Sequence, residues 1–213
     1  MAFAGKGAKC VLCSRSSDLE QIVEEIKARG GEAVGIMADI SEEQTARKLA
    51  SAALSNYDTI DIWVNNAGII GYSAIDFIER EKMVRMFEVN TFGTIYCCKE
   101  ALLNMKPQRS GHIINIISTA GKEGKVNESV YVATKFAVAG FTETLCEEAH
   151  PYGIRVTGIY TGGMRTHLFD NEHLDKDINT FMDPKEVAGL VVYIANLPED
   201  MAPKEIVVKR MKD

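Results

Sequence analysis

The stretch His-Ile-Ile-Asn-Ile-Ile-Ser, residues 112–118, decides the fold class. Its apolar residues run on without the alternation of a half-exposed strand, as in a parallel strand that helices cover on both faces. Outward from it, beginning at Lys9, strand-like apolar runs alternate with helix-like ones, and no linker or repeat interrupts them. This order predicts an α/β fold with a doubly wound parallel sheet in three α/β/α layers.

The expected elements follow from apolar spacing and from helix start and stop signals. Ser41 and Gln44 have the spacing of a capping box, and Asp183 followed by Pro184 has the pattern of a helix start. Helices are expected to cover Leu19–Ile26, Ala46–Ala53, Glu81–Lys106 (ending before Pro107), Tyr131–Ala149 and Val187–Ile194. Strands are expected at Lys9–Ser14, Ala33–Met37, Ile60–Val64, His112–Ile117, Ile154–Tyr160 and Ile206–Val208.

Length and composition restrict the protein class. A chain of 213 residues, 46% hydrophobic and 25% charged, suits a single domain spanning residues 1–213 with a substantial core. Lys and Arg number 24 against 30 Asp and Glu, without a basic cluster, which argues against nucleic-acid partners. No uncharged apolar run reaches the roughly 20 residues of a membrane helix.

The cysteines and the N-terminus favour a cytoplasmic location. Five cysteines are an odd number, as expected for reduced thiols, and Lys6 and Lys9 interrupt the apolar start that a secretory signal would need. Cys10 and Cys13 read C-x-x-C, but three positions along a strand place them on opposite faces. We therefore expect packing roles for them rather than redox or metal chemistry.

Tyr131 and Lys135 are the central chemical pair. Four residues apart on a helix, they share one face and can reach a common ligand. An adjacent ammonium favours the phenolate, which would bring a phenol closer to useful acid-base chemistry at neutral pH. The alternative is an exposed helix pair.

Ser118 and the turn Asn65-Asn66-Ala67-Gly68 each follow a predicted strand, where ligands of open parallel sheets bind. A hydroxyl at position 118 can donate to a carbonyl oxygen that becomes alkoxide-like. The small residues and amides of the turn would let a flat ligand lie close to the backbone. The alternatives are an ordinary turn serine and an ordinary β-turn.

These motifs together resemble the short-chain dehydrogenase/reductase family, whose fold is Rossmann-like. The resemblance covers nearly the whole chain, from Ala2 to the last strand. The matching segments occur in the family's order and spacing: Asn65-Asn66-Ala67-Gly68, Asn90 in Val89-Asn90-Thr91, Ser118, Tyr131-Val132-Ala133-Thr134-Lys135, and Gly162-Gly163-Met164-Arg165-Thr166.

The resemblance implies hydride transfer between a nicotinamide cofactor and a CH–OH or carbonyl group of a small molecule. The resemblance also implies that Tyr131 is the general acid-base and that Ser118 orients the substrate oxygen. Lys135 would lower the tyrosine pKa and hold the nicotinamide ribose. Asn90 would fix a water of a proton relay; its alternative is a helix-interior amide that bonds backbone. The residues expected along the cofactor are Ser14, Arg15, Asp39, Ile40, Asn66, Ala67, Gly68, Tyr131, Lys135, Thr161, Gly162, Met164 and Thr166.

The residues at the end of the first predicted strand indicate which cofactor the chain prefers. An acid there would bind an unmodified ribose, but the chain has Ser14 and then Arg15, whose guanidinium suits a 2′-phosphate. NADP(H) is therefore expected over NAD(H), the alternative being that Arg15 is a solvated surface charge. Thr161 departs from the proline usual in the family, which weakens that part of the assignment.

The segment Met164–Met182 is expected to be a lid or binding loop. His167, Asp170 and His173 have spacings seen in metal sites, but we expect polar lid residues and no metal. With Ile69 and Ile70, Leu168 and Phe169 indicate a partly hydrophobic pocket, which suits keto esters, sugars, hydroxy acids and acyl thioesters alike.

Family members commonly form dimers or tetramers through helices that here would be Glu81–Lys106 and Tyr131–Ala149. The apolar residues Ala137, Phe141 and Leu145 on the second of these helices permit such an interface. A homodimer or homotetramer is therefore expected.

The N-terminus departs from the family pattern. Members ordinarily begin with a buried strand and a T-G-x-x-x-G-x-G turn whose N–H groups hold the cofactor diphosphate, and nothing here matches it. Met1–Ala4 resembles the end of the helix that follows, with Gly7 as its C-cap, and about 20 residues of such a unit are unmatched. We expect the native gene product to carry that segment, whose strand would lie between those ending at Ser14 and Asn65. If it is absent, a non-catalytic ligand-binding or oligomerisation module is the alternative function.

Overall fold

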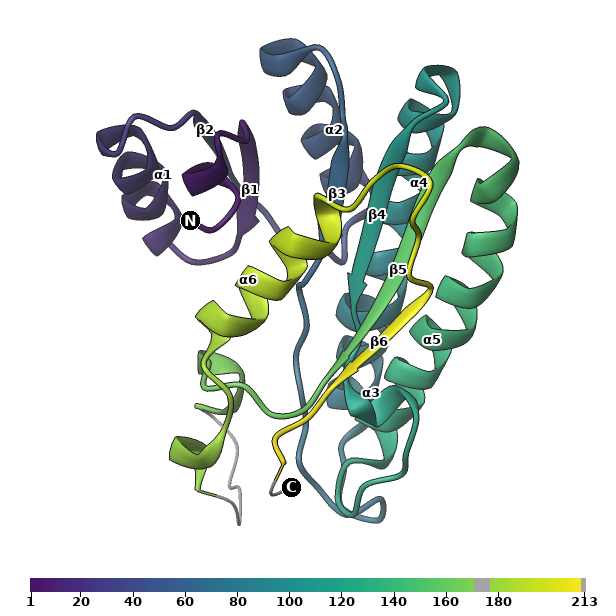
Figure 1. Ribbon diagram of the computed structural model, residues 1–213. Coiled ribbons are helices and arrows are strands. Elements are labelled where there is room, and N and C mark those ends of the chain that lie inside the picture. Colours follow the sequence, from purple (N-terminus) through teal and green to yellow (C-terminus); the bar gives the residue numbers. More distant parts are fainter. Residues whose placement is uncertain (171–176, 212–213) are drawn as a thin grey trace.

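The computed structural model describes residues 1–170 and 177–211 and has a Rossmann-like α/β fold built from parallel strands (Figure 1). Two sheets carry these strands, a small one of order β1-β2 and a larger one of order β3-β4-β5-β6. The strands are β1 (Cys10–Ser14), β2 (Ala33–Met37), β3 (Ile62–Asn65), β4 (Gly111–Ile116), β5 (Ile154–Thr161) and β6 (Glu205–Val208). The expected parallel α/β architecture is confirmed.

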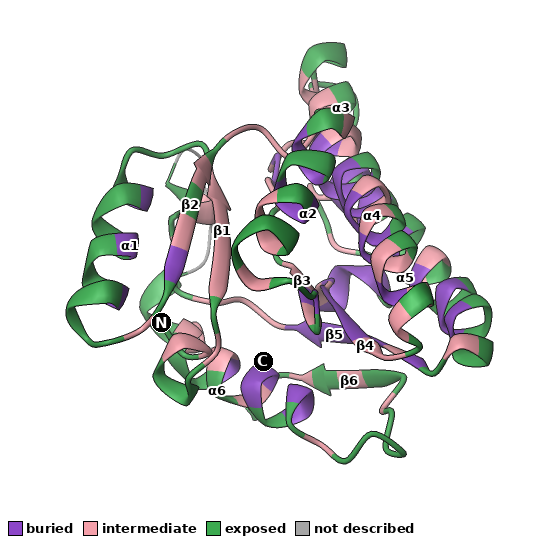
Figure 2. Ribbon diagram, turned by 90° about the horizontal axis from the view of Figure 1, so that it is seen from above, coloured by how far each residue is buried: buried purple, intermediate pink, exposed green. Residues whose placement is uncertain are grey.

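Helices cover both faces of the strands. They are α1 (Asp18–Ala28), α2 (Glu43–Tyr57), α3 (Arg80–Phe87), α4 (Gly93–Gln108), α5 (Ser129–Ala149) and α6 (Pro184–Ala195). The main core joins α2, α4 and α5 to one face of β3, β4 and β5, while α6 packs on the opposite face through Val191 and Ile194. Figure 2 shows most buried residues in β4, β5 and the helices beside them, which places the main core in this half of the molecule.

The small sheet has its own two faces. Cys13 packs with Val11 toward the main core, whereas Cys10 packs with Leu12 toward α1, so the two thiols lie on opposite faces as the strand period requires. Burial raises the pKa of both thiols, and both are free. The packing role expected for them is confirmed by these contacts.

The facing edges of β1 and β3 are unpaired. In a parallel ladder, alternate residues direct both backbone groups to the same neighbour. Since Cys10 N–H and Ser14 C=O bond to the β2 segment, and Asp61 C=O bonds to His112, the intervening residues point the other way. Within the described residues, the backbone groups of Val11, Cys13, Ile62 and Val64 therefore meet no strand.

Several local expectations are wrong or need revision. The Ser41 hydroxyl bonds Asp39 instead of capping α2, whose N-cap is Glu42, so no capping box forms. Pro107 lies inside the last turn of α4 rather than after it, and Arg109 in the left-handed region ends that helix. Leu145 is 4% exposed in the main core, so it does not contribute to a subunit interface.

Other local expectations hold. Asp183 caps α6 by accepting from Lys185 N, with Pro184 in the first turn. Gly7 is a left-handed C-cap, closing the short 3₁₀ helix Ala4–Lys6. None of the helices in the described ranges is long and apolar enough to cross a membrane.

Candidate active site

One cavity of about 2100 Å³ lies at the carboxyl ends of the strands and extends between the two sheets. Open parallel sheets bind ligands at this edge. The cavity is lined by fourteen of the residues expected in the site: Ser14, Arg15, Asp39, Ile40, Asn66, Ala67, Gly68, Ser118, Tyr131, Lys135, Thr161, Gly162, Met164 and Thr166. Asn90 is the expected site residue that does not line it.

Ser118 is held in a strained conformation directly after β4. Its φ of 139° and ψ of 154° lie in a region that residues with a Cβ rarely adopt, and such strain tends to occur at functional sites. Its Oγ accepts from Ala120 N at 3.1 Å, and its side chain hydrogen-bonds the phenol of Tyr131. The end of β4 thus presents the hydroxyl to the first turn of α5.

Tyr131 and Lys135 share the buried face of α5, with exposed fractions of 6% and 5%. Lys135 Nζ lies 5.7 Å from the centroid of the Tyr131 ring. A Cβ at Gly68 would lie 3.6 Å from the same Nζ, so the turn after β3 closes over the ammonium. An exposed helix pair, the alternative considered for Tyr131 and Lys135, is not what the structure shows.

Burial dominates the titration of this pair. It raises the pKa of Tyr131 to about 12, with the Ser118 hydrogen bond opposing and the charge of Glu128 adding to the rise. It lowers the pKa of Lys135 to about 8, because the ammonium is desolvated. The expected lowering of the Tyr131 pKa by Lys135 is therefore not found in this arrangement, in which desolvation is the largest effect on the phenol.

Asn90 lies in a π-helical turn, Glu88–Phe92, between α3 and α4. Its amide accepts from Ile69 N at 2.8 Å and donates to Ile69 O at 2.9 Å and to Thr134 Oγ1 at 3.1 Å. This matches the alternative of an amide that bonds backbone. Asn90 therefore fixes the loop after β3 from behind the cavity.

At the opposite end of the cavity, Arg15 follows β1 and Asp39 follows β2. Asp39 Oδ1 accepts from Ser41 N and Oγ, and its Oδ2 contacts Arg85 of α3, while Arg15 Nη1 is 3.9 Å away. These bonds lower the pKa of Asp39 against the effect of its partial burial. Sequence reasoning missed Arg85, because no local pattern relates α3 to an acid 46 positions earlier.

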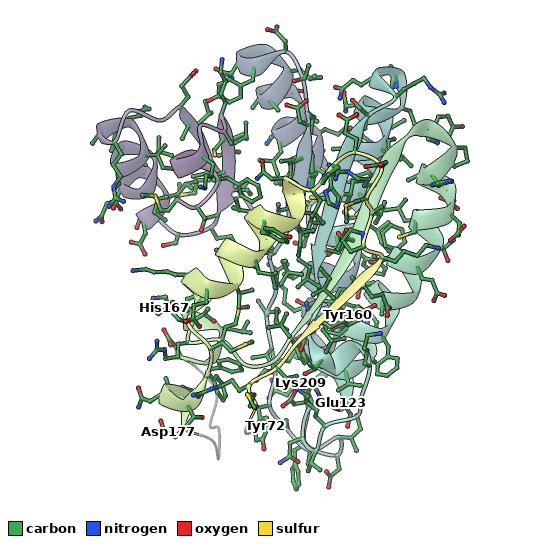
Figure 3. The ribbon with its side chains drawn as sticks, viewed as in Figure 1. Tyr72, Glu123, Tyr160, His167, Asp177 and Lys209 are labelled. Carbon is green, nitrogen blue, oxygen red and sulfur yellow. The ribbon has the colours of Figure 1, made fainter. Side chains whose placement is uncertain are left out.

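The segment after β5 closes one side of the cavity. Leu168 and Phe169 pack on the cluster that contains Tyr131, and the Phe169 and Phe181 rings meet edge to face with centroids 5.4 Å apart. His167 Nδ1 is 2.8 Å from Asp170 Oδ2, and Figure 3 shows His167 and Asp177 in this part of the molecule. His173, the third residue considered for a metal, lies outside the described residues.

The cavity suits a nicotinamide dinucleotide at both of its ends. A guanidinium, that of Arg15, lines one end, and a hydroxyl, a phenol and an ammonium converge at the other end. The volume of the cavity also includes the space between the unpaired edges of β1 and β3, whose residues line it along both strands. Arg15 and Lys135 are the cations that would hold such a group.

Known proteins share this sequence and fold. A family model for short chain dehydrogenase matches residues 1–177. The 3-oxoacyl-(acyl-carrier-protein) reductase of Synechocystis sp. is 31% identical over 205 residues, which are 93% of this chain and 83% of that protein.

Two solved structures share the fold. An alcohol dehydrogenase from the archaeon Thermococcus sibiricus, complexed with 5-hydroxy-NADP, has a TM-score of 0.90 at 24% identity, covering 100% of this chain and 90% of its own. A 7α-hydroxysteroid dehydrogenase complexed with NADH and 7-oxo glycochenodeoxycholic acid has a TM-score of 0.88 at 25% identity, covering 97% and 85%.

Proposed function

The chain belongs to the short-chain dehydrogenase family, and from that premise we propose that it interconverts a small carbonyl compound and its alcohol with NADP(H). The observation that carries the proposal is the convergence of Ser118, Tyr131 and Lys135 on one cavity at the end of β4. A strained serine, a buried phenol and a buried ammonium meet there, and each has a place in carbonyl chemistry.

Each side chain has a distinct role in reduction. The Ser118 hydroxyl donates a hydrogen bond to the carbonyl oxygen and fixes its position. Tyr131, fully protonated at neutral pH because its pKa is about 12, donates the proton that the oxygen needs as it becomes an alkoxide. Lys135 is positively charged below pH 8 and stabilises the developing negative charge. The hydride itself would come from the bound nicotinamide.

Preference for NADP(H) is supported by Arg15 at the cavity edge. A guanidinium binds a phosphate monoester through a planar pair of donors, whereas a carboxylate in that place would repel it. The fold itself does not decide the cofactor, because the hydroxysteroid dehydrogenase with the same fold was solved with NADH.

The first prediction tests the acid role. Tyr131→Phe removes the phenolic proton and keeps the buried ring, so we expect turnover to fall by about 10²- to 10⁴-fold with little change in melting temperature. The measurement is NADPH oxidation with a panel of carbonyl compounds, alongside thermal melts by circular dichroism. Turnover retained in a folded Tyr131→Phe variant would eliminate the acid role.

A cofactor titration separates this proposal from the non-catalytic alternative. Saturable quenching or enhancement of NADPH fluorescence by the purified chain supports the oxidoreductase. No binding at millimolar NADPH supports a ligand-binding or oligomerisation module instead.

A further inference from the structure

At the adenosine end of the cavity, one carboxylate lies between two guanidiniums. Asp39 Oδ1 accepts from Ser41 N at 3.0 Å and from Ser41 Oγ at 2.8 Å, and Oδ2 contacts Arg85 Nη2. Arg85 Nη1 donates to the same Ser41 Oγ at 2.7 Å. Asp39, Ser41 and Arg85 therefore form a closed ring of hydrogen bonds that uses both carboxylate oxygens.

Arg15 is left outside this ring. Its Nη1 is 3.9 Å from Asp39 Oδ2, beyond hydrogen-bond distance, and its side chain is 58% exposed at the cavity. Asp39 is its one ion-pair partner among residues 1–170 and 177–211. Glu88 lies 3.4 Å from Arg85 but is 43% exposed, so solvent screens it.

We propose that Arg85 is a positioning residue that sets the preference for a phosphorylated adenosine by occupying Asp39 and leaving Arg15 to the phosphate. This inference rests on the proposed function and deepens it. Arg85 does not line the cavity, so it acts through Asp39 rather than by touching the nucleotide. Without Arg85, the carboxylate would attract Arg15 and repel a phosphate beside it.

The test uses two fragments that report binding without turnover, 2′,5′-ADP and 5′-AMP. Calorimetric titration of the full chain should show 2′,5′-ADP binding at least about 10-fold more tightly than 5′-AMP, because only the former offers a 2′-phosphate to Arg15. In Arg85→Met the ratio of the two affinities should fall toward one. In Arg15→Met the two fragments should bind equally well. Arg47→Met is the matched control, since Arg47 pairs with Glu43 and Glu100 and does not line the cavity.

Rescue distinguishes positioning from direct contact. If Arg85 acts by occupying Asp39, then Arg85→Met combined with Asp39→Asn should recover most of the 2′,5′-ADP preference, and Arg85→Lys should keep part of it. Melting temperatures confirm that each variant folds. An unchanged ratio in Arg85→Met, no recovery in the double variant, or no wild-type preference for 2′,5′-ADP would each overturn the proposal.

The two proposals fail separately. Absence of turnover with any carbonyl and either cofactor would contradict the proposed function, while fragment binding that still depends on Arg85 would uphold the positioning role. Turnover together with a fragment preference that does not change in Arg85→Met would support the proposed function and contradict the positioning role.

Discussion

At the scale of single residues, Lys135 is a buried cation that the stability of the fold alone would not favour. The residue is 5% exposed, and no carboxylate of the described residues lies within ion-pair distance of its ammonium. Taking an unpaired charge out of water is unfavourable, which is why burial lowers the pKa of Lys135 to about 8. A destabilising group that is kept at the centre of a cavity indicates a functional requirement.

We therefore predict that Lys135→Met stabilises the chain while abolishing turnover. At pH 7 the folded state carries the unfavourable buried ammonium, and an apolar chain of similar length removes it, so the free energy of unfolding should rise by about 1–4 kcal/mol. Between pH 8 and the unfolded-state pKa near 10.5 the unfolded chain binds more protons, so wild-type stability gains from this group as pH rises.

Denaturant unfolding of both proteins from pH 7 to 10.5 measures this effect. The advantage of Lys135→Met should shrink across that range as the wild-type amine becomes neutral. A variant less stable than wild type at pH 7 would show that the ammonium is stabilised by its surroundings.

The residues that we propose for the chemistry were predictable, but their partners were not. Strand-end position and helical spacing singled out Ser118, Tyr131 and Lys135, the family resemblance gave them roles, and the structure brings them to one cavity. The direction of the Tyr131 pKa depends on how deeply the ring is buried, which spacing does not determine. Arg85 reaches Asp39 only through the packing of α3 against the loop after β2.

At the scale of elements, the π-helical turn Glu88–Phe92 joins the helical layer to the loop after β3. The wider turn places the Asn90 side chain against both backbone groups of Ile69, directly after the turn Asn65–Gly68. Single π-helical turns of this kind are frequent at functional sites. Apolar spacing predicted one continuous helix here, since one wider turn shifts the periodicity too little to detect.

For Asn90→Ala we expect a loss of about 1–3 kcal/mol in unfolding free energy, because the Ile69 N–H and C=O lose their partners. Turnover should fall more than stability suggests, since the released loop covers Lys135. Asn90→Asp keeps the acceptor for Ile69 N but loses the donor, so it should lie between wild type and alanine. Steady-state kinetics and denaturant unfolding of the three proteins provide the comparison; full activity in Asn90→Ala would show that other contacts hold the loop.

At the scale of the whole molecule, the strands were predictable, but their division into two sheets was not, because the expectation was one doubly wound parallel sheet. Apolar runs place each strand to within about two residues, because a strand buried on both faces has few polar positions. Which strands pair is a non-local property. In the part of the chain that the structure describes, the edge strands β1 and β3 share no ladder, and helices and the shared core hold them together, with Val11 and Cys13 packing with α2 and α4.

The unpaired edges should be visible in amide exchange. Within each edge strand, N–H groups alternately donate to the neighbouring strand and point into the cavity. Adjacent residues of the same strand should therefore differ in their protection from amide exchange. By NMR we expect exchange faster by at least about tenfold at Val11, Cys13, Ile62 and Val64 than at Leu12, Ser14 and Trp63. Because alternate residues of one strand share its local stability, the comparison is internal and separates an open edge from general fraying. Equal protection along β1 and β3 would mean that the two edges are covered in solution.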